Sequence, residues 1–274
     1  MIGKASRIHF GGEKYWSIFS TQVAAQFAYW GDLATHSLSI VMFMFIFFHL
    51  WKTTYQSVGS GLQAISGLTL RETLWYLMLA EVIVLSKPSL SRSVSQAVKD
   101  GSIAYLLNKP YHFLLYQFSI AMGESLVHML FNILAGGVMA WFLVGPPPNP
   151  RGWPLVLLAM LIALLIDFCI NAMIGLAAFI TEEVSAFEWI YQKFLFLLGG
   201  LLIPLDFFPG WLRSIAGVLP FAYTVYGPAR LFVDPTWMRF ANLLFGQICW
   251  LAGLALLLHF LYNKGVHWLT INGG

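Results

Sequence analysis

Long apolar runs recur along this 274-residue chain and leave it few possible folds. Apolar residues make up 59% of the sequence and charged residues only 10%, whereas a soluble domain contains about 25% charged residues. So few charges cannot cover a water-facing surface, and a run of about 20 apolar residues crosses a bilayer as a helix. The sequence therefore predicts an all-α, polytopic membrane protein. Its net charge of +3 is too small for a nucleic-acid-binding surface.

We expect six membrane-spanning helices within one transmembrane domain that covers residues 1–274. The second run is short, with Arg71 and Glu72 near its start and Glu81 inside it. The third is longer than a bilayer requires, so it tilts, bends at Gly136-Gly137 or extends beyond the membrane. The predicted spans lie at 33–51 and 68–86 (segment 33–86), at 111–144 and 153–180 (segment 111–180), at 186–203 and at 240–262.

The segments outside these spans also have expected structures. Residues 1–32 contain no apolar stretch typical of a cleaved signal peptide, and Tyr15 to Trp30 mixes aromatic and polar residues as an interfacial helix does. Residues 204–235 are too apolar for a loop and too rich in proline for a spanning helix, so we expect a re-entrant pair of short helices. The alternative there is a seventh span, which would move the tail 263–274 across the membrane.

Basic residues indicate the orientation, since the cytoplasmic loops of membrane proteins carry an excess of Lys and Arg. The connection 87–110 contains four basic residues and a single acid. With six spans, more Lys and Arg residues fall on the side of this connection than on the other side. We therefore expect both termini in the cytoplasm.

Common catalytic and cofactor-binding patterns are missing from the sequence. It contains no G-x-x-x-x-G-K-[ST] phosphate-binding loop, so the chain is not expected to hydrolyse ATP itself. It also lacks the H-E-x-x-H, G-x-S-x-G and paired C-x-x-C patterns, and both cysteines, Cys169 and Cys249, lie in apolar runs. We predict no catalytic residue, no bound cofactor and no metal.

Polar residues inside the third and fourth spans form two stripes. Glu124, His128 and Asn132 follow one another at intervals of four residues, which places them on one helix face. Asp167 and Asn171 have the same spacing in the next span. Because the two helices are expected to run antiparallel, the stripes could face one another. The stripes then either form hydrogen bonds that hold the helices together or line a pathway that binds substrate or carries protons.

Glu81 of the second span could pair with either stripe. In a substrate pathway, Glu81, Glu124 and Asp167 would attract a cationic molecule, because acids outnumber bases within the spans. A metal site built from Glu124, His128 and Asp167 is conceivable but lacks further ligands.

The connection 87–110 is the most informative segment outside the spans. Ser91 to Lys99 predicts a short polar helix, and Gly101 follows where a C-cap glycine is expected. The apolar patch Ile-Ala-Tyr-Leu-Leu at 103–107 favours a docking surface for a partner; alternatively, it packs on the membrane interface or on its own bundle. The next predicted cytoplasmic loop is acidic, because it contains Glu182, Glu183 and Glu188. This loop is either a contact for a partner or a solvated turn.

Several of these segments resemble type-2 ATP-binding-cassette (ABC) exporter permeases. The sequence D-G-S-I-A-Y-L-L-N-K-P at 100–110 is similar to the hallmark cytoplasmic segment of that family. The sequence L-I-P-L-D-F-F-P-G-W-L at 202–212, followed by L-P-F-A-Y at 219–223, resembles its extracellular re-entrant signature. Y-G-P-A-R-L-F at 226–232 and L-T-I-N-G-G at 269–274 resemble the viologen-exporter-like subgroup.

The resemblance implies half of a membrane pathway for a hydrophobic or amphipathic molecule such as a drug, antibiotic or lipid. Two permease chains, paralogous or identical, would pair with two copies of a cytoplasmic P-loop ATPase that binds ATP and Mg. The chain would lie among the lipids of a bacterial cytoplasmic (inner) membrane and would bind no nucleic acid. The competing reading is an ATP-independent secondary transporter that uses mid-membrane carboxylates.

The resemblance also assigns roles to residues. The N-terminal interfacial helix would be the connecting helix of the family. The segment that couples the chain to the ATPase would contain Asp100, Gly101, Ile103, Leu106, Leu107 and Pro110. The extracellular re-entrant gate would contain Pro204, Asp206, Pro209, Trp211 and Pro220.

Overall fold

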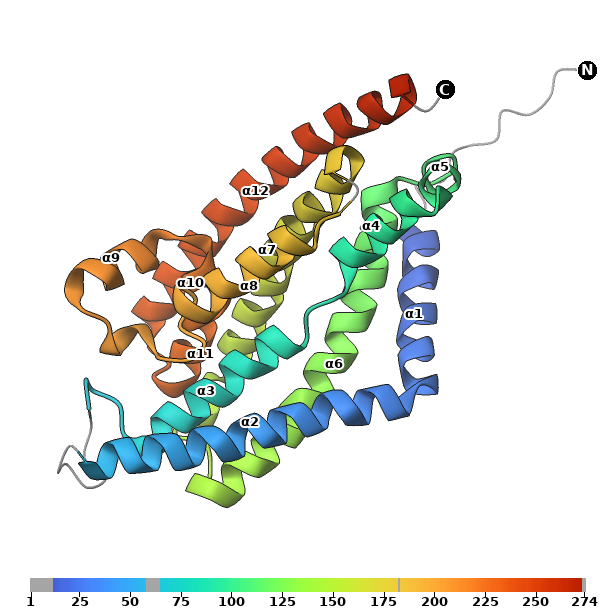
Figure 1. Cartoon of the computed structure of the whole chain (residues 1–274). Helices are drawn as coiled ribbons and strands as arrows, with labels where there is room; N and C mark the ends of the chain where they lie inside the picture. Colours follow the sequence, from blue (N-terminus) through green and yellow to red (C-terminus); the bar gives the residue numbers. More distant parts are fainter. Residues whose placement is uncertain (1–11, 58–64, 182, 273–274) are drawn as a thin grey trace, which may run out of the picture.

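The computed structural model describes residues 12–57, 65–181 and 183–272, and this part of the chain is all-helical (Figure 1). The expectations for residues 1–11, Glu182 and the last two glycines therefore lie outside the described residues. The helices of the first half are α1 (Gly12–Ala28), α2 (Trp30–Ser57), α3 (Leu70–Leu85), α4 (Leu90–Lys99), α5 (Ser102–Leu107) and α6 (Phe113–Val144). Those of the second half are η1 (Pro150–Gly152), α7 (Trp153–Thr181), α8 (Ser185–Leu197), η2 (Leu205–Phe207), α9 (Gly210–Val218), α10 (Pro220–Thr224), α11 (Tyr226–Val233) and α12 (Trp237–Asn272).

Five helical stretches among the described residues are long and apolar enough to cross a membrane, which confirms a multi-pass architecture. They match the predicted first, second, third, fourth and sixth spans. The second stretch combines α3 and α4 across a break at residues 86–89. The five stretches are Leu33–Ser57, Leu70–Lys99, Phe113–Val144, Trp153–Thr181 and Trp237–Gly265.

The predicted fifth span differs from the structure. Helix α8 contains 13 residues, which at 1.5 Å per residue is about 20 Å and falls short of a hydrocarbon core of about 30 Å. The helix ends before Gly199 and Gly200, and Gly200 takes a φ of +76°, a conformation that strongly favours glycine. The apolar run continues to Ile203, but the helix does not, so the six-span count is not confirmed.

The chain nevertheless has to return between α7 and α12. A Cβ at Gly152 would touch Pro235, just before α12, while one at Gly265 would touch Phe179 near the end of α7. These contacts show that α7 and α12 run parallel. Residues 183–236 therefore carry the chain from one end of the bundle to the other, through α8, an irregular segment and the short helices α9 to α11 (Figure 1).

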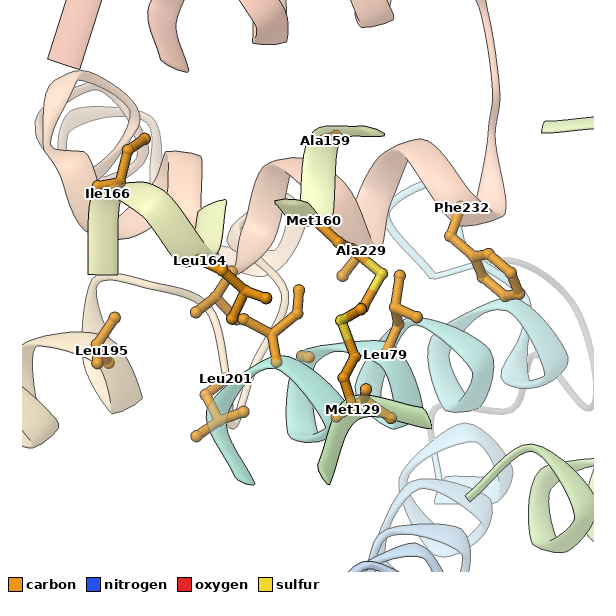
Figure 2. Packing of buried hydrophobic residues seen from close by; sticks show 14 of the residues in the cluster. Leu79, Met129, Ala159, Met160, Leu164, Ile166, Leu195, Leu201, Ala229 and Phe232 are labelled. Carbon is orange, nitrogen blue, oxygen red and sulfur yellow. The ribbon is translucent and has the colours of Figure 1, made fainter. Parts of the chain in front are cut away.

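Helix α3 lies at the centre of the bundle. Its residues from Thr73 to Ile83 are all buried, among α2, α6 and α11. Figure 2 shows Leu79 of α3, Met129 of α6 and Met160 of α7 converging in this core. The second span is therefore surrounded by protein along most of its length.

Charged residues at the start of α3 have structural roles. Glu72 and Thr69 form a capping box that satisfies the first backbone N–H groups of the helix. Arg71 donates to the carbonyl oxygens of Pro146 and Pro147 at 2.7 and 3.2 Å, and so ties α3 to the turn after α6. The polar beginning of this span is thus a helix cap joined to a loop.

Helices α1 and α2 pack against α6. The Tyr15 hydroxyl of α1 accepts a hydrogen bond from the backbone N–H of His112 at 2.9 Å. Helix α6 continues without interruption through Gly136 and Gly137. Gly136 allows a close approach instead, because a Cβ there would lie 2.7 Å from Cδ1 of Ile40 in α2. The location of α1 at the membrane interface stays a prediction.

Candidate functional site: a polar cavity at the break between α3 and α4

The break at residues 86–89 is where the predicted polar stripes meet. Helix α3 ends at Leu85, with Ser86 as its C-cap, and Pro88 cannot donate the hydrogen bond that would continue the helix. Residues of this segment bond both to α6 and to α7. Its sequence, Ser-Lys-Pro-Ser, presents one cationic and two hydroxyl side chains to these neighbours.

Asp167 is held by three side chains in this region. Lys87 Nζ lies 2.5 Å from Asp167 Oδ1, and the Tyr191 hydroxyl of α8 donates to the same oxygen at 2.6 Å. Asn171 Nδ2 donates to Asp167 Oδ2 at 2.8 Å. Both carboxylate oxygens are therefore occupied, and Asp167 is 2% exposed. The arrangement is a buried ion pair with satisfied hydrogen bonds.

The stripe on α6 bonds to the same break. The backbone N–H and the hydroxyl of Ser89 lie 3.3 and 3.4 Å from Glu124 Oε1, and Asn132 Nδ2 donates to the Ser86 hydroxyl at 3.2 Å. Glu124 and Asn132 of α6 thus bond to the break, and Lys87 of the same break pairs with Asp167 of α7. The break is therefore bonded to residues of both stripes, and a direct contact between the stripes stays a prediction.

Helix α4 is fixed to α7 and α8 by packing and charge. Val94 packs over Gly175, where an added Cβ would lie 3.2 Å from Val94 Cβ. Buried Glu188 of α8 accepts from the Ser91 hydroxyl at 2.6 Å and from Arg92 Nε at 2.8 Å. These contacts hold the polar helix against the membrane bundle.

A second, exposed ion pair lies at the far end of α4. Lys99 Nζ is 2.5 Å from Glu183 Oε2, and the hydrogen bond from Lys99 lowers the pKa of Glu183 to about 2. Together with the bonds to Glu188, this shows that both described acids of the acidic loop contact α4 of the same chain. They are therefore not merely a solvated turn.

A cavity of roughly 540 Å³ opens beside the break. Four of the predicted stripe residues line it, namely Glu81, Glu124, His128 and Asn171. Sequence reasoning missed Lys87 and Tyr191 as members of this site, although a lysine directly before a proline at the end of an apolar run was a visible signal. The cavity is also lined by Phe43, Lys87, Arg92, Glu188, Tyr191 and Phe196. In the described ranges, no group of three or more His, Cys, Asp or Glu side chains could hold a metal ion.

The predicted coupling segment forms a helix–turn–helix at one end of the bundle. Gly101 adopts a φ of +74°, as expected of a glycine that ends a helix. Asp100 Oδ1 accepts from the backbone N–H of Ser102 at 2.9 Å, and this bonding lowers the pKa of Asp100. In Figure 1, α5 lies at the same end of the molecule as the last turns of α12. The turn between α4 and α5 is thus held by the conformation of Gly101 and by the hydrogen bond to Asp100.

Only part of the apolar patch on α5 is exposed. Ile103 is 3% exposed and belongs to the core, and Leu106 and Leu107 pack partly against it. Tyr105 is 68% exposed, with Lys109 Nζ 4.6 Å from the centre of its ring. The free face of α5 therefore centres on Tyr105, while Pro110 is exposed at the end of the segment.

The predicted gate residues lie at the opposite end. Pro204 and Pro220 are buried, whereas Pro209 and Trp211 are exposed. Asp206 organises the irregular segment, and its partners are Arg230 at 3.1 Å, Arg213 at 3.4 Å and the Tyr226 hydroxyl at 3.1 Å. A further bond that sequence reasoning missed joins the Tyr76 hydroxyl of α3 to the Gly200 carbonyl oxygen at 2.7 Å.

Comparison with known protein families gives a match described as ABC-2 family transporter protein over residues 39–273. This chain belongs to the ABC-2 family. Members of the ABC-2 family are membrane components of ABC-type transporters and not ATPases themselves, so membership implies an ATPase partner. The comparison with curated proteins returns no significant match.

Proposed function

We propose that this chain is the permease subunit of an ABC exporter. It would form half of the translocation pathway for a hydrophobic or amphipathic small molecule, driven by ATP hydrolysis on a separate subunit. ATP and Mg would bind to that ATPase, and this chain would supply a cavity, a gate and a lever. The predicted orientation would place the termini in the cytoplasm of a bacterial cell, with the chain in its inner membrane.

The observation that carries the proposal is the continuous connection from α5 to the cavity. Helix α5 joins α4 through Gly101, and α4 is bonded to α8 through Arg92 and Glu188. Lys87, which precedes α4, is bonded to Asp167 in α7. A displacement of α5 by an ATPase would therefore move two sides of the cavity together, since coupling travels through rigid elements joined by specific contacts.

Pairing of two permease chains is the second part of the proposal. Families of this type combine two membrane halves, and the resemblance to the viologen-exporter-like subgroup favours two paralogous permeases with one kind of ATPase. Exposed apolar residues of α2, such as Leu38, Met42 and Phe45, leave a large face available for lipid or a second permease.

The test is purification of the tagged chain from its native membrane in mild detergent, with stoichiometric partners identified by mass spectrometry. We expect a P-loop ATPase and a second permease. Tyr105→Asp, on the exposed face of α5, should lose the ATPase. Ser214→Asp, on an exposed position of α9 at the other end, is the matched control and should retain it. A chain that purifies without any P-loop ATPase would contradict the proposal.

A further inference from the structure

Most carboxylates at the cavity beside the α3–α4 break are already bonded within the chain. Asp167, just behind the cavity wall, is paired with Lys87. Glu188 accepts from Ser91 and Arg92, and Glu124 lies within hydrogen-bond distance of Ser89. The two cations that line the cavity are thus both matched by an acid.

Glu81 is different. It lines the same cavity from the middle of α3 and is only 2% exposed. No hydrogen bond or ion pair joins its carboxyl group to another residue in the described part of the chain. An acid inside a membrane protein is expensive unless a partner compensates it, and such residues commonly mark a substrate or ion pathway.

The walls around Glu81 are aromatic. Phe43 of α2, Tyr191 of α8 and Phe196 of α8 line the cavity together with the carboxyl group. Aromatic rings attract organic cations through their electron-rich faces, and a nearby carboxylate adds a fixed countercharge. The volume of roughly 540 Å³ also falls in the usual range for small-molecule pockets.

We infer that this cavity binds an organic cation with an apolar body and that Glu81 holds the positive charge. The inference rests on the proposed function, because the bound cation would be the transported molecule. A free amphipathic amine and the amine headgroup of a lipid share this chemistry. Asp167 is excluded from the role because both of its oxygens are occupied by residues of the chain.

The test measures equilibrium binding to the purified, full-length chain in detergent, without ATP. The probes are tetraphenylphosphonium, a permanent cation, and triphenylphosphine oxide, a neutral analogue. Glu81→Gln should weaken tetraphenylphosphonium binding by about tenfold or more and leave the neutral probe nearly unchanged. Glu81→Asp should keep the preference for the cation. Glu13→Gln, which removes an exposed acid of α1, is the matched control.

Three results would overturn the inference. They are a wild-type chain with no preference for the cation, a Glu81→Gln chain that binds the cation normally, and an equal loss of both probes in a variant whose melting temperature is unchanged. If Glu81→Gln does not fold, loss of the cation preference in a folded Glu81→Asp variant decides against the role. A Glu81 that only carries a proton would give the second result.

A competition experiment separates the two sources of the cation. Displacement of tetraphenylphosphonium by phosphatidylethanolamine, but not by phosphatidylglycerol, supports the site with a lipid amine as its ligand. If neither lipid displaces tetraphenylphosphonium, the result supports the site with a free amphipathic amine as its ligand. Because no ATPase takes part in these measurements, their failure leaves the exporter proposal intact, and absence of an ATPase partner leaves the binding result intact.

Discussion

Lys87 Nζ lies 2.5 Å from Asp167 Oδ1, and this contact joins the break between α3 and α4 to the middle of α7. Tyr191 of α8 donates to the same carboxylate oxygen. Three elements that are far apart in the sequence are thus fastened at one point. Lys87 directly precedes α4, and α4 leads to α5, the helix that we propose to receive the movement of the ATPase.

Breaking this pair on one side should destabilise the protein strongly. Lys87→Gln or Asp167→Asn alone leaves a buried charge without its partner, which lowers the free energy of unfolding by about 3–5 kcal/mol. The double variant should recover most of that loss, since no unpaired charge remains. Thermal unfolding of the four proteins in one detergent measures the effect. Losses that simply add in the double variant would mean that the two charges act independently.

Glu188→Gln should separate ATP hydrolysis from transport. Glu188 keeps α4 attached to α8 through Arg92 and Ser91, so its neutral form should weaken the lever while leaving the exposed face of α5 intact. We expect the assembled complex to hydrolyse ATP and to transport several-fold less per ATP. Lys99→Gln, which affects only an exposed pair, serves as the comparison and should change the ratio little. An equal amount of transport per ATP hydrolysed in the two variants would contradict this role of α4.

The pair between Lys99 and Glu183 predicts a measurable pH dependence. The pKa of Glu183 lies at about 2 rather than at its ordinary 4.5, chiefly because Lys99 donates to it. The stabilisation is therefore present above pH 4.5 and lost as the pH falls through about 2. Carboxyl-selective NMR of the purified chain should show Glu183 titrating near the lower value in the wild type. In Lys99→Met its pKa should rise towards 4.5; an unshifted titration would refute the pairing.

Gly101→Ala should distort the coupling segment through its backbone. Space is no obstacle, because an added Cβ would meet nothing within 4 Å, but the φ of +74° is one that Ala rarely adopts. We expect a penalty of about 1–2 kcal/mol and weaker retention of the ATPase during purification. Gly137→Ala is the matched control, since this glycine is helical and equally uncrowded. Equal retention by both variants would show that the turn does not orient α5.

The positions of the helices could largely be predicted from the sequence, because a run of apolar residues is a direct signal of a spanning helix. The error at α8 has a local cause. The residues after Leu197 stay apolar as far as Ile203, so hydropathy continues where the helix stops. The Gly199-Gly200 pair marks that end. The turn at Gly101 was predicted correctly because a C-cap glycine is also a local signal.

The candidate site could be predicted only in part. The spacing of Glu124, His128 and Asn132 identified residues that gather near one break, but it could not show what faces them. Lys87 was read as an orientation charge, yet it is mostly buried against Asp167. Such pairings depend on how distant helices pack, and a single sequence does not encode them in any local pattern. Likewise, the sequence does not show that Glu81 has no bonding partner among the described residues.

The central claim is that this chain exports an amphipathic cation at the expense of ATP hydrolysed by a partner. The most direct measurement reconstitutes the purified complex into vesicles with the ATPase side outward and follows uptake of tetraphenylphosphonium. The account predicts uptake that requires both ATP and the ATPase subunit and that falls in Glu81→Gln. Uptake that persists without the ATPase and follows an imposed proton gradient would contradict it, and would favour a secondary transporter.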